Sequence, residues 1–411
     1  MILFTIDKPY EKDIFYKKVL NQFIITFQNL SYDCELVPIG NVADFSQNSL
    51  DFVFCLNSGR KQKLQSSVPW VSWFHDVHMN TIGENFSHFY KNDIAYFIGE
   101  PSLFGVDPEK LPIRSSILLP SLTSCDTNFN DHSSIIKTLD ILLIGYLPPI
   151  YQEDEHTPDD VMDAEIVSKR YQEESKITLL HESGMIFDRH PYLRNLLIKV
   201  VLDNYRALSG NLDTNKILSE LCSCIDKYFG GSKIRESYGS KRLYLDYYAT
   251  HLPRRLDRIK LAELGVESGC SFEIIGKGWE NEHRFINHYL GFINPKFIHS
   301  ELSKSRFILC NNTHGLSFNH RIIDAIMNDC IVFNHTTPHA GKLGTLENCL
   351  IPEEDFIQYD EANLLGKIQG LLQDESKMQS ITKSAKSKIL NSHNTTNRAK
   401  QILKDLNLSC N

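Results

Sequence analysis

Residues 306–334 read RFILCNNTHGLSFNHRIIDAIMNDCIVFN, and this segment is the most informative about the fold. Two short apolar runs, Arg306–Cys310 and Cys330–Asn334, flank a polar loop through Gly315 and an amphipathic segment at His320–Asn328. Short apolar runs are typical of buried strands, and the segment between them has the spacing of a helix. Parallel neighbours need such a crossover connection. The stretch therefore predicts a strand, helix and strand of one parallel sheet.

The same alternation recurs over most of the chain. Further strands are expected at Ile2–Ile6, Glu35–Ile39, Phe52–Leu56, Trp70–Phe74, Ile94–Ile98, Ser116–Leu119, Leu139–Ile144, Ser271–Ile275 and Tyr289–Phe292. Further helices are expected at Asp13–Leu30, Leu252–Ser268 and Pro295–Ser303, and after Glu361. Runs that are apolar on both faces and separated by helices predict parallel sheets covered on both sides.

The order of these elements predicts two Rossmann-like domains. We expect an N-terminal domain at 1–136, a C-terminal domain at 137–390 and a C-terminal helix at 391–411. The segment 151–245 breaks the rhythm: it begins with an acidic stretch and continues with leucines at helical spacing, so we expect a helical insertion. Two such sheets form a cleft between them, and ligands bind there at the carboxyl ends of the strands.

Composition excludes several classes of protein. The chain has 411 residues, of which 42% are hydrophobic and 23% charged, as in ordinary globular proteins. The net charge of −8 argues against a nucleic-acid binder, which needs a basic surface. The N-terminus does not resemble a signal peptide, and no window is apolar enough for a membrane span. Ten scattered cysteines fit neither a redox motif nor a zinc ribbon. We expect a cytoplasmic protein without structural disulfides, for which peripheral membrane association stays open.

Two histidines and an aspartate follow the predicted strand Trp70–Phe74, in the sequence His75-Asp76-Val77-His78. A transfer to a hydroxyl with inversion needs a base near that hydroxyl, and His75 or Asp76 has the chemistry for it. A polar loop that caps the next helix would explain the same residues. Three ligands this close in one loop rarely fit one metal ion. We take His75 and Asp76 as the candidate catalytic residues and predict no metal site.

A glycine-containing loop follows the predicted strand Ser271–Ile275, in the sequence Gly276-Lys277-Gly278-Trp279. Glycines let a backbone approach a ligand closely, and Lys277 has the charge to pair with phosphate. The pattern is not the dinucleotide fingerprint, because Asn281 stands where the third glycine would fall. Ordinary turns also produce such glycines. Gly276, Lys277 and Gly278 are candidate residues for binding a phosphorylated ligand.

The loop and helix start at 311–325 carry the most informative polar residues. A helix N-terminus attracts anions such as a diphosphate, and Ser317 or Asn319 has the side chain to cap it. Arg321 near that end is unfavourable to the helix dipole unless an anion binds there. Arg321 and Asp324 share a face, where they could hold phosphate and ribose or form a surface ion pair. The candidate ligands of this stretch are Asn312, His314, Gly315, Arg321 and Asp324.

Two further clusters have simpler interpretations. Arg254, Arg255 and Arg258 begin a predicted helix and are expected to form a solvated face, with phosphate contact as the alternative. His393–Arg398 is expected to cap the last helix.

Several of these motifs together resemble the C-terminal domain of CgeB-like and group 1 glycosyltransferases, over Gly315–Leu403. Members of that family have the motif R-x-x-(E/D)-A, which is followed by a turn of small residues and a short apolar strand. The matching segments here are Arg321-Ile322-Ile323-Asp324-Ala325, Asn328–Phe333, His393 to Arg398, Leu139–Gly145 and Arg255–Trp279. The N-terminal half matches mainly at Val68–Asp76.

The resemblance implies the GT-B fold, with two Rossmann-like domains whose parallel sheets face a central cleft. It implies that the C-terminal domain holds the donor nucleotide and the N-terminal domain the acceptor. By position, Asp324 matches the ribose-binding acid, Arg321 the nearby basic residue, and Gly276 and Gly278 the glycine loop. The chain departs from the family at Leu316, where related retaining enzymes carry a first acid.

We therefore expect a glycosyltransferase that moves a sugar from a nucleotide-diphosphate sugar to an unidentified glycan, lipid or protein acceptor. No metal or other cofactor is expected, because helix N–H groups, Arg321 and Lys277 would stabilise the leaving diphosphate. The alternatives are a nucleotide-sugar epimerase on the same scaffold and a catalytically degenerate protein that binds nucleotide sugars. The missing acid at Leu316 keeps the second alternative open.

Overall fold

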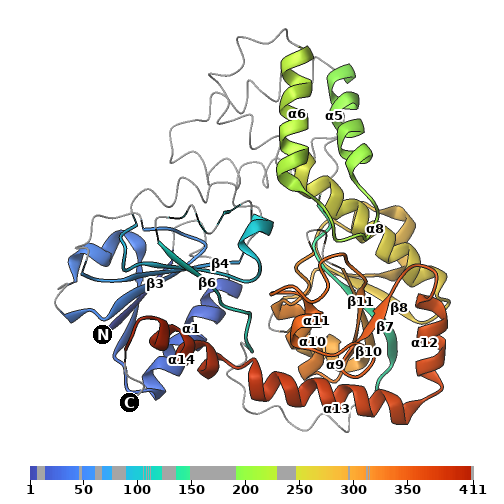
Figure 1. Ribbon diagram of the computed structural model, residues 1–411. Coiled ribbons are helices and arrows are strands. Elements are labelled where there is room, and N and C mark those ends of the chain that lie inside the picture. Colours follow the sequence, from blue (N-terminus) through green and yellow to red (C-terminus); the bar gives the residue numbers. More distant parts are fainter. Residues whose placement is uncertain are drawn as a thin grey trace.

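The structure is a computed structural model, and two parallel sheets of six strands dominate it (Figure 1). It describes residues 1–6, 14–45, 49–60, 67–75, 89–104, 106–107, 109, 111, 113–122, 136–148, 191–228, 247–294, 297–311, 313 and 315–408. The predicted α/β class with two parallel sheets is confirmed. We call the part of the chain around each sheet a lobe.

The first lobe is built on the strand order β2-β1-β3-β4-β5-β6. Its strands are β1 (Ile2–Ile6), β2 (Cys34–Pro38), β3 (Phe52–Leu56), β4 (Trp70–Phe74), β5 (Ile94–Phe97) and β6 (Arg114–Ile117). Its helices are α1 (Ile14–Asn29) and the short 3-10 helices η2 (Ile39–Asp44) and η4 (Pro101–Phe104). The order reverses direction at β1 and β3, which is the arrangement that places a ligand crevice at the carboxyl ends of the central strands.

The second lobe is built on the strand order β12-β11-β10-β7-β8-β9. Its strands are β7 (Leu139–Ile144), β8 (Phe272–Ile275), β9 (Tyr289–Gly291), β10 (Ser305–Cys310), β11 (Ile331–His335) and β12 (Ile357–Tyr359). Its helices are η8 (Tyr247–His251), α8 (Leu252–Glu267), η9 (His283–His288), α9 (Ile298–Lys304), α10 (His320–Met327), α11 (Leu346–Cys349), α12 (Leu364–Leu372) and α13 (Glu375–Ser392).

Both faces of the second sheet are buried, as its continuous apolar strands predict. On one face, Phe307 and Phe333 pack against α8 and α12. On the other face, Ile308 and Val332 pack against α9, α10 and α13. Successive residues of a strand point to opposite faces, so each strand contributes to both cores. This packing fixes α8 and α10 on either side of the sheet, with residues of both near the carboxyl end of β7.

The chain crosses back to the first lobe at its C-terminal end. Helix α14 (Thr395–Asp405) shares a core with α1, while α13 stays with the second lobe (Figure 1). Asn394 caps α14 by accepting from the N–H of Asn397 at 2.8 Å. Arg398 donates to the carbonyl oxygens of Leu119 and Pro120, so α14 is tied to the segment that joins the lobes.

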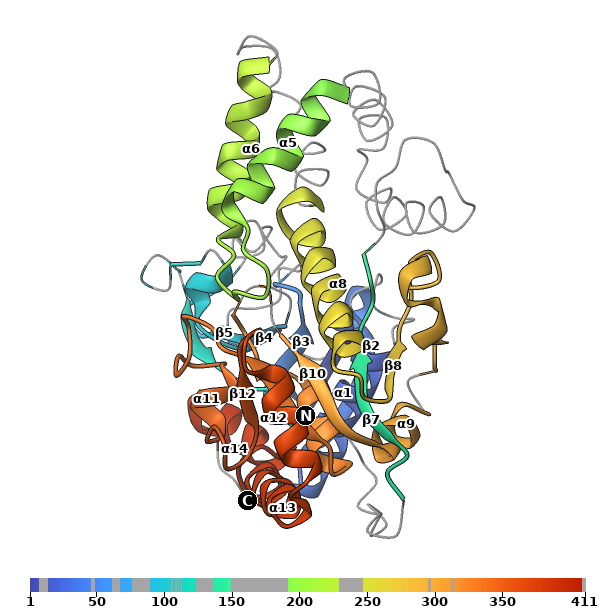
Figure 2. The same cartoon turned by 90° about the vertical axis from the view of Figure 1, so that its right-hand side faces the viewer.

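Helices α5 (Pro191–Asn204) and α6 (Thr214–Tyr228) project from the second lobe (Figures 1 and 2). The two helices and the loop between them fall within the predicted insertion at 151–245, of which 151–190 and 229–245 lie outside the described part of the chain. The loop between the two helices is docked on the lobe. Asp257 of α8 accepts from the Tyr205 hydroxyl at 2.6 Å and from the Leu208 N–H at 2.7 Å. The insertion is therefore anchored beside the carboxyl end of the second sheet.

A few predicted boundaries differ from the structure. The strand expected at Ser116–Leu119 is β6 at Arg114–Ile117, an edge strand that is only half buried. Strand β12, three residues long, had no predicted counterpart. None of the helices in the described ranges is long and apolar enough to cross a membrane.

Candidate functional site

Arg258 of α8 lies against the loop that follows β7. A Cβ at Gly145 would come within 3.1 Å of the Arg258 Cζ, so the glycine leaves the space that the guanidinium fills. The Nη1 atom of Arg258 is buried and has no hydrogen-bond partner in the described part of the chain. Burial, Arg321 and Arg254 hold the pKa of Arg258 well below its usual value. Asp257 and Tyr146 oppose this effect without reversing it, so Arg258 is a buried guanidinium in a site where positive charge prevails.

Arg321 brings a second charge to this point from the first turn of α10. It is close enough to Arg258 to lower the pKa of that residue. Among the described residues, no ion pair joins Arg321 to Asp324 or to any other acid. The surface ion pair that the sequence left open is therefore not formed.

Arg254 and His251 extend the positive site along α8. His251, Arg254 and Arg258 recur at three and four residues, which places them on one face of a helix. Burial, with Arg254 and Arg258, lowers the pKa of His251 to about 4. We call Arg254, Arg258 and Arg321 the arginine cluster. Phosphate oxygens are well matched to guanidinium groups, so the cluster is suited to a diphosphate.

Arg255 does not belong to the cluster. It forms a buried ion pair with Glu282 and donates to the Pro148 carbonyl at 2.6 Å. The three arginines expected on one solvated face thus have two different environments: Arg258 lies near Arg254 and Arg321, and Arg255 holds the loop after β7.

The N-terminus of α10 is capped by the protein itself. The Asn319 Oδ1 accepts from the N–H groups of Arg321 at 3.1 Å and Ile322 at 3.3 Å. The Ser317 Oγ instead accepts from the Leu346 N–H at 2.7 Å. Because the cap occupies two of the free N–H groups, the side chains of the arginine cluster are the stronger anion ligands here.

Asp324 lies one turn further along α10 and faces the first lobe. Burial raises the pKa of its carboxyl group, while Lys18 of α1 and His299 of α9 oppose that rise. Lys18 belongs to the first lobe, so Asp324 lies where the two lobes meet.

The glycines of the 276–278 loop are explained by the protein's own packing. Gly276 has φ +147° and Gly278 has φ +88°. A Cβ would come within 2.1 Å of the Gly145 oxygen at the first and 2.0 Å of the Leu147 oxygen at the second. Both glycines therefore permit close approach of the loops after β7 and β8. Lys277 is exposed, with its ammonium over the ring of Phe292. Ligand contact by these three residues stays a prediction.

The loop after β10 contains three further candidates. Gly315 has φ +82°, and a Cβ there would come within 2.4 Å of His339 and 2.8 Å of the Gly210 oxygen. Gly315 is thus in contact with the docked loop of the insertion. Asn312 and His314 lie outside the described residues.

His75 is placed at the carboxyl end of β4, as predicted, and Asp76 lies outside the described residues. The His75 N–H donates to the Asn57 Oδ1 at 2.6 Å. The His75 ring stacks on His320, the first residue of α10, with centroids 5.5 Å apart. Burial, then the His320 charge, keeps the pKa of His75 well below its usual value, so its imidazole is neutral at pH 7. The contact joins the first lobe to the helix that carries Arg321.

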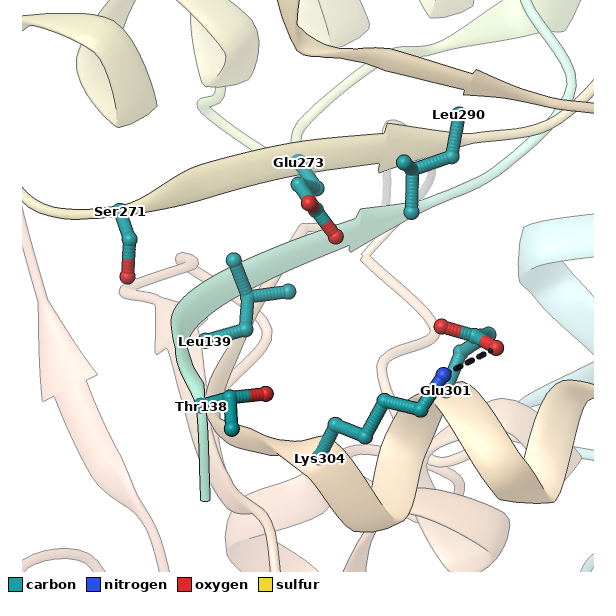
Figure 3. Close-up of a pocket in the computed structure, with 7 residues that line it drawn as sticks. All are labelled: Thr138, Leu139, Ser271, Glu273, Leu290, Glu301 and Lys304. Carbon is teal, nitrogen blue, oxygen red and sulfur yellow. Dashed lines mark hydrogen bonds and ion pairs between the residues drawn. The ribbon is translucent and has the colours of Figure 1, made fainter. Parts of the chain in front are cut away.

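A separate pocket lies at the other end of the strands of the second sheet (Figure 3). It is lined by Thr138, Leu139, Ser271, Glu273, Leu290, Glu301 and Lys304. Lys304 is paired with Glu301 at 2.8 Å. The pocket stands at the amino ends of β7 and β8, whereas ligands of open parallel sheets bind at the carboxyl ends. The described residues contain no group of three or more potential metal ligands.

Comparisons with known proteins agree with this architecture. Residues 254–404 match the model of a family described as "Glycosyl transferase-like". The chain is similar to T4 phage BGT in complex with its UDP-glucose substrate, at 10% identity and a TM-score of 0.51, over 99% of this chain and 100% of that one. It is similar to a DNA modifying enzyme, beta-glucosyltransferase, at 10% identity and a TM-score of 0.50, over the same shares. No curated protein matches the chain.

At such identities the structural likeness shows the fold alone, and that fold is GT-B: two Rossmann-like lobes that face each other. The family match begins at Arg254 and includes the whole arginine cluster. Sequence reasoning placed Arg258 on a solvated helix face, with phosphate contact as the alternative, and did not single out His320 or Lys18. For Arg258, the three- and four-residue spacing of His251, Arg254 and Arg258 was the available signal.

Proposed function

We propose that the protein is a glycosyltransferase that moves a sugar from a nucleotide-diphosphate sugar to an acceptor hydroxyl. The observation that carries the proposal is the arginine cluster at the carboxyl end of the second sheet, in which Arg258 has a buried Nη1 without a partner in the described residues. A diphosphate would supply the missing negative charge. The match of residues 254–404 to a glycosyltransferase-like family supports the same assignment.

In the proposed reaction the acceptor oxygen attacks the anomeric carbon of the donor. The bond from that carbon to the diphosphate breaks, and its electron pair stays on the diphosphate oxygen. Arg254, Arg258 and Arg321 would stabilise the charge that develops there. Three cations in this position can perform the role that a divalent metal ion performs in other transferases, so we propose that the reaction is metal-independent.

The acceptor is proposed to bind on the first lobe, next to His75 and Asp76. A neutral imidazole can accept the proton that the acceptor hydroxyl releases. Asp324 is proposed to accept hydrogen bonds from the ribose hydroxyls of the donor. Arg321 and Asp324 are three residues apart on α10, which supports this role because ribose is attached directly to the diphosphate.

The proposal is tested by calorimetric titration with UDP, GDP, dTDP and CMP, and with inorganic pyrophosphate. We expect at least one nucleoside diphosphate to bind to the wild type, and Arg321→Ala and Asp324→Ala to weaken that binding. Only Arg321→Ala should weaken the binding of pyrophosphate, because pyrophosphate has no ribose for Asp324 to contact. Unchanged nucleotide affinity in both variants would contradict the proposed site.

Product analysis separates transfer from the alternatives. With a preferred nucleotide sugar and no acceptor, we expect slow release of the free nucleoside diphosphate as water takes the place of the acceptor. An epimerase would convert the donor into an isomer without releasing nucleotide, and a degenerate binding protein would leave it intact.

A further inference from the structure

The two lobes meet at a pair of stacked histidines. The rings of His75 and His320 are 5.5 Å apart between centroids and are inclined by 17°. Phe15 of α1 lies edge-on to His320 at 5.0 Å, and Trp73 of β4 lies edge-on to His75 at 4.0 Å. The pair is therefore enclosed by aromatic rings of the first lobe.

Three ring nitrogens of this pair have no hydrogen-bond partner among the residues that the structure describes. The Nε2 of His75 and both ring nitrogens of His320 are buried and unpartnered within the described part of the chain. The backbone of Ser121 lies close enough to His320 to oppose the lowering of its pKa. Buried polar groups are normally paired, and leaving one unpaired costs stability. Phenylalanine would make the same ring contacts without that cost, so packing alone does not account for a histidine at 320.

The position of His320 relates it to the proposed donor site. It directly precedes Arg321 of the arginine cluster and lies one turn before Asp324. Lys18 of α1 is close enough to affect the pKa of both His320 and Asp324. His320 thus lies between the arginine cluster, which would bind the diphosphate, and the first lobe, which would bind the acceptor. The transferred sugar must also lie between them, because it is bonded to the diphosphate and is attacked by the acceptor.

We propose that His320 binds hydroxyl groups of the transferred sugar, beside His75. This inference rests on the proposed function. A neutral imidazole has one donor and one acceptor nitrogen, and a sugar hydroxyl can meet both. The ring of Phe15 offers an apolar surface to the carbon face of a sugar. When the sugar enters, it takes up the hydrogen bonds that the stacked pair leaves unmade.

The test compares each free nucleotide with the nucleotide sugar that contains it. The pairs are UDP with UDP-glucose, GDP with GDP-mannose, and dTDP with dTDP-glucose, titrated calorimetrically into the wild type, His320→Phe and His320→Gln. For the pair that the wild type binds, His320→Phe should change the affinity for the nucleotide less than twofold and reduce the affinity for the nucleotide sugar at least tenfold. His320→Gln, which retains a donor and an acceptor, should recover part of that loss. His288→Phe, on η9 at the other edge of the sheet, is the matched control.

Thermal unfolding of the same variants separates binding from packing. Because phenylalanine removes two unpaired nitrogens, His320→Phe should be at least as stable as the wild type. Unchanged nucleotide-sugar affinity in a folded His320→Phe would overturn the inference while leaving the proposed function intact. A wild type that binds none of the pairs would overturn the proposed function and the inference with it.

Discussion

At the scale of single residues, the arginine cluster has the sharpest consequences. Arg254 and Arg321 lie near Arg258, and the buried Nη1 of Arg258 has no hydrogen-bond partner among the described residues. The like charges therefore destabilise the free protein until an anion binds. Arg258→Gln should therefore raise the melting temperature of the free protein. It should lower the affinity for a nucleoside diphosphate at least tenfold, or about 1.4 kcal/mol.

Calorimetry and thermal unfolding measure the two effects of Arg258→Gln. The control is Arg284→Gln, which removes a charge that is 57% exposed on η9. Equal affinities in Arg258→Gln and the wild type would mean that the cluster does not bind the diphosphate.

His75 is the candidate base, and its removal should affect turnover rather than donor binding. His75→Ala is expected to lower kcat by about 100-fold or more, in the usual range for a general base. The affinity for the donor nucleotide should change little, because the arginine cluster is untouched. Steady-state kinetics together with titration check both statements. A wild-type kcat in this variant would exclude His75 as the base, and Asp76→Ala is then the variant to examine.

At the scale of elements, the contact between β4 and α10 should make stability depend on pH. Burial lowers the pKa of His320 from 6.5 to about 4; the backbone of Ser121 opposes this shift and Lys18 adds to it. Between those values the unfolded chain binds a proton that the folded chain does not. Folding is therefore penalised progressively as the pH falls from 6.5 to 4, by on the order of 3 kcal/mol.

Denaturant unfolding at pH 4.5, 5.5, 6.5 and 7.5 measures this penalty. His75, His251 and His393 also have lowered pKa values and contribute in the same direction. The contribution of His320 is isolated by His320→Phe, whose stability should fall less steeply with decreasing pH. Parallel curves for the variant and the wild type would contradict the account.

The docked loop between α5 and α6 should contribute to the stability of the second lobe. The Tyr205 hydroxyl donates to the buried carboxylate of Asp257, which also accepts from Asn311. Tyr205→Phe removes one hydrogen bond to a charged group, and we expect a loss of roughly 1.5–3 kcal/mol in urea unfolding. Lys216→Ala, at an exposed site on α6, is the control and should be neutral. Equal stability of both variants would show that the hydroxyl contact is unimportant.

Most elements could be predicted from the sequence because apolar periodicity is a local property. Strands β1, β3, β4 and β7 have the predicted bounds: the first three are uninterrupted buried runs, and most residues of β7 are buried. Strand β12 was missed because Ile357–Tyr359 is too short to show a period. The role of Asn319 as the cap of α10 was one of two possibilities, and only the tertiary contact of Ser317 with Leu346 decides between them.

At the scale of the whole molecule, the site depends on contacts that sequence distance conceals. Arg258 and Arg321 come from helices on opposite faces of the second sheet, and Lys18 comes from the other lobe. Local patterns identified Arg321 and Asp324 because both lie on one helix. The same local patterns predicted that Arg254 and Arg258 lie on a solvated helix face, because no local feature indicates that Arg258 approaches Arg321 in the folded protein.

A contact of the C-terminal helix α14 with the segment between the lobes was also not predicted from the sequence. Arg398 was expected only to belong to a cap of the last helix, yet its guanidinium contacts the carbonyl oxygens of Leu119 and Pro120. This contact ties α14 to the segment that joins the lobes, although Arg398 and Leu119 are far apart in sequence. The predicted domain boundary at 136 falls between β6 and β7.

The central claim is that the arginine cluster binds the diphosphate of a sugar donor. Its most direct test is a crystal structure of the protein soaked with the nucleoside diphosphate that binds best in titration. The account predicts density for the two phosphates within hydrogen-bonding distance of Arg258 and Arg321, with the ribose against Asp324. A nucleotide bound elsewhere, for example in the pocket beside Glu273 and Lys304, with the arginine cluster unoccupied, would contradict it.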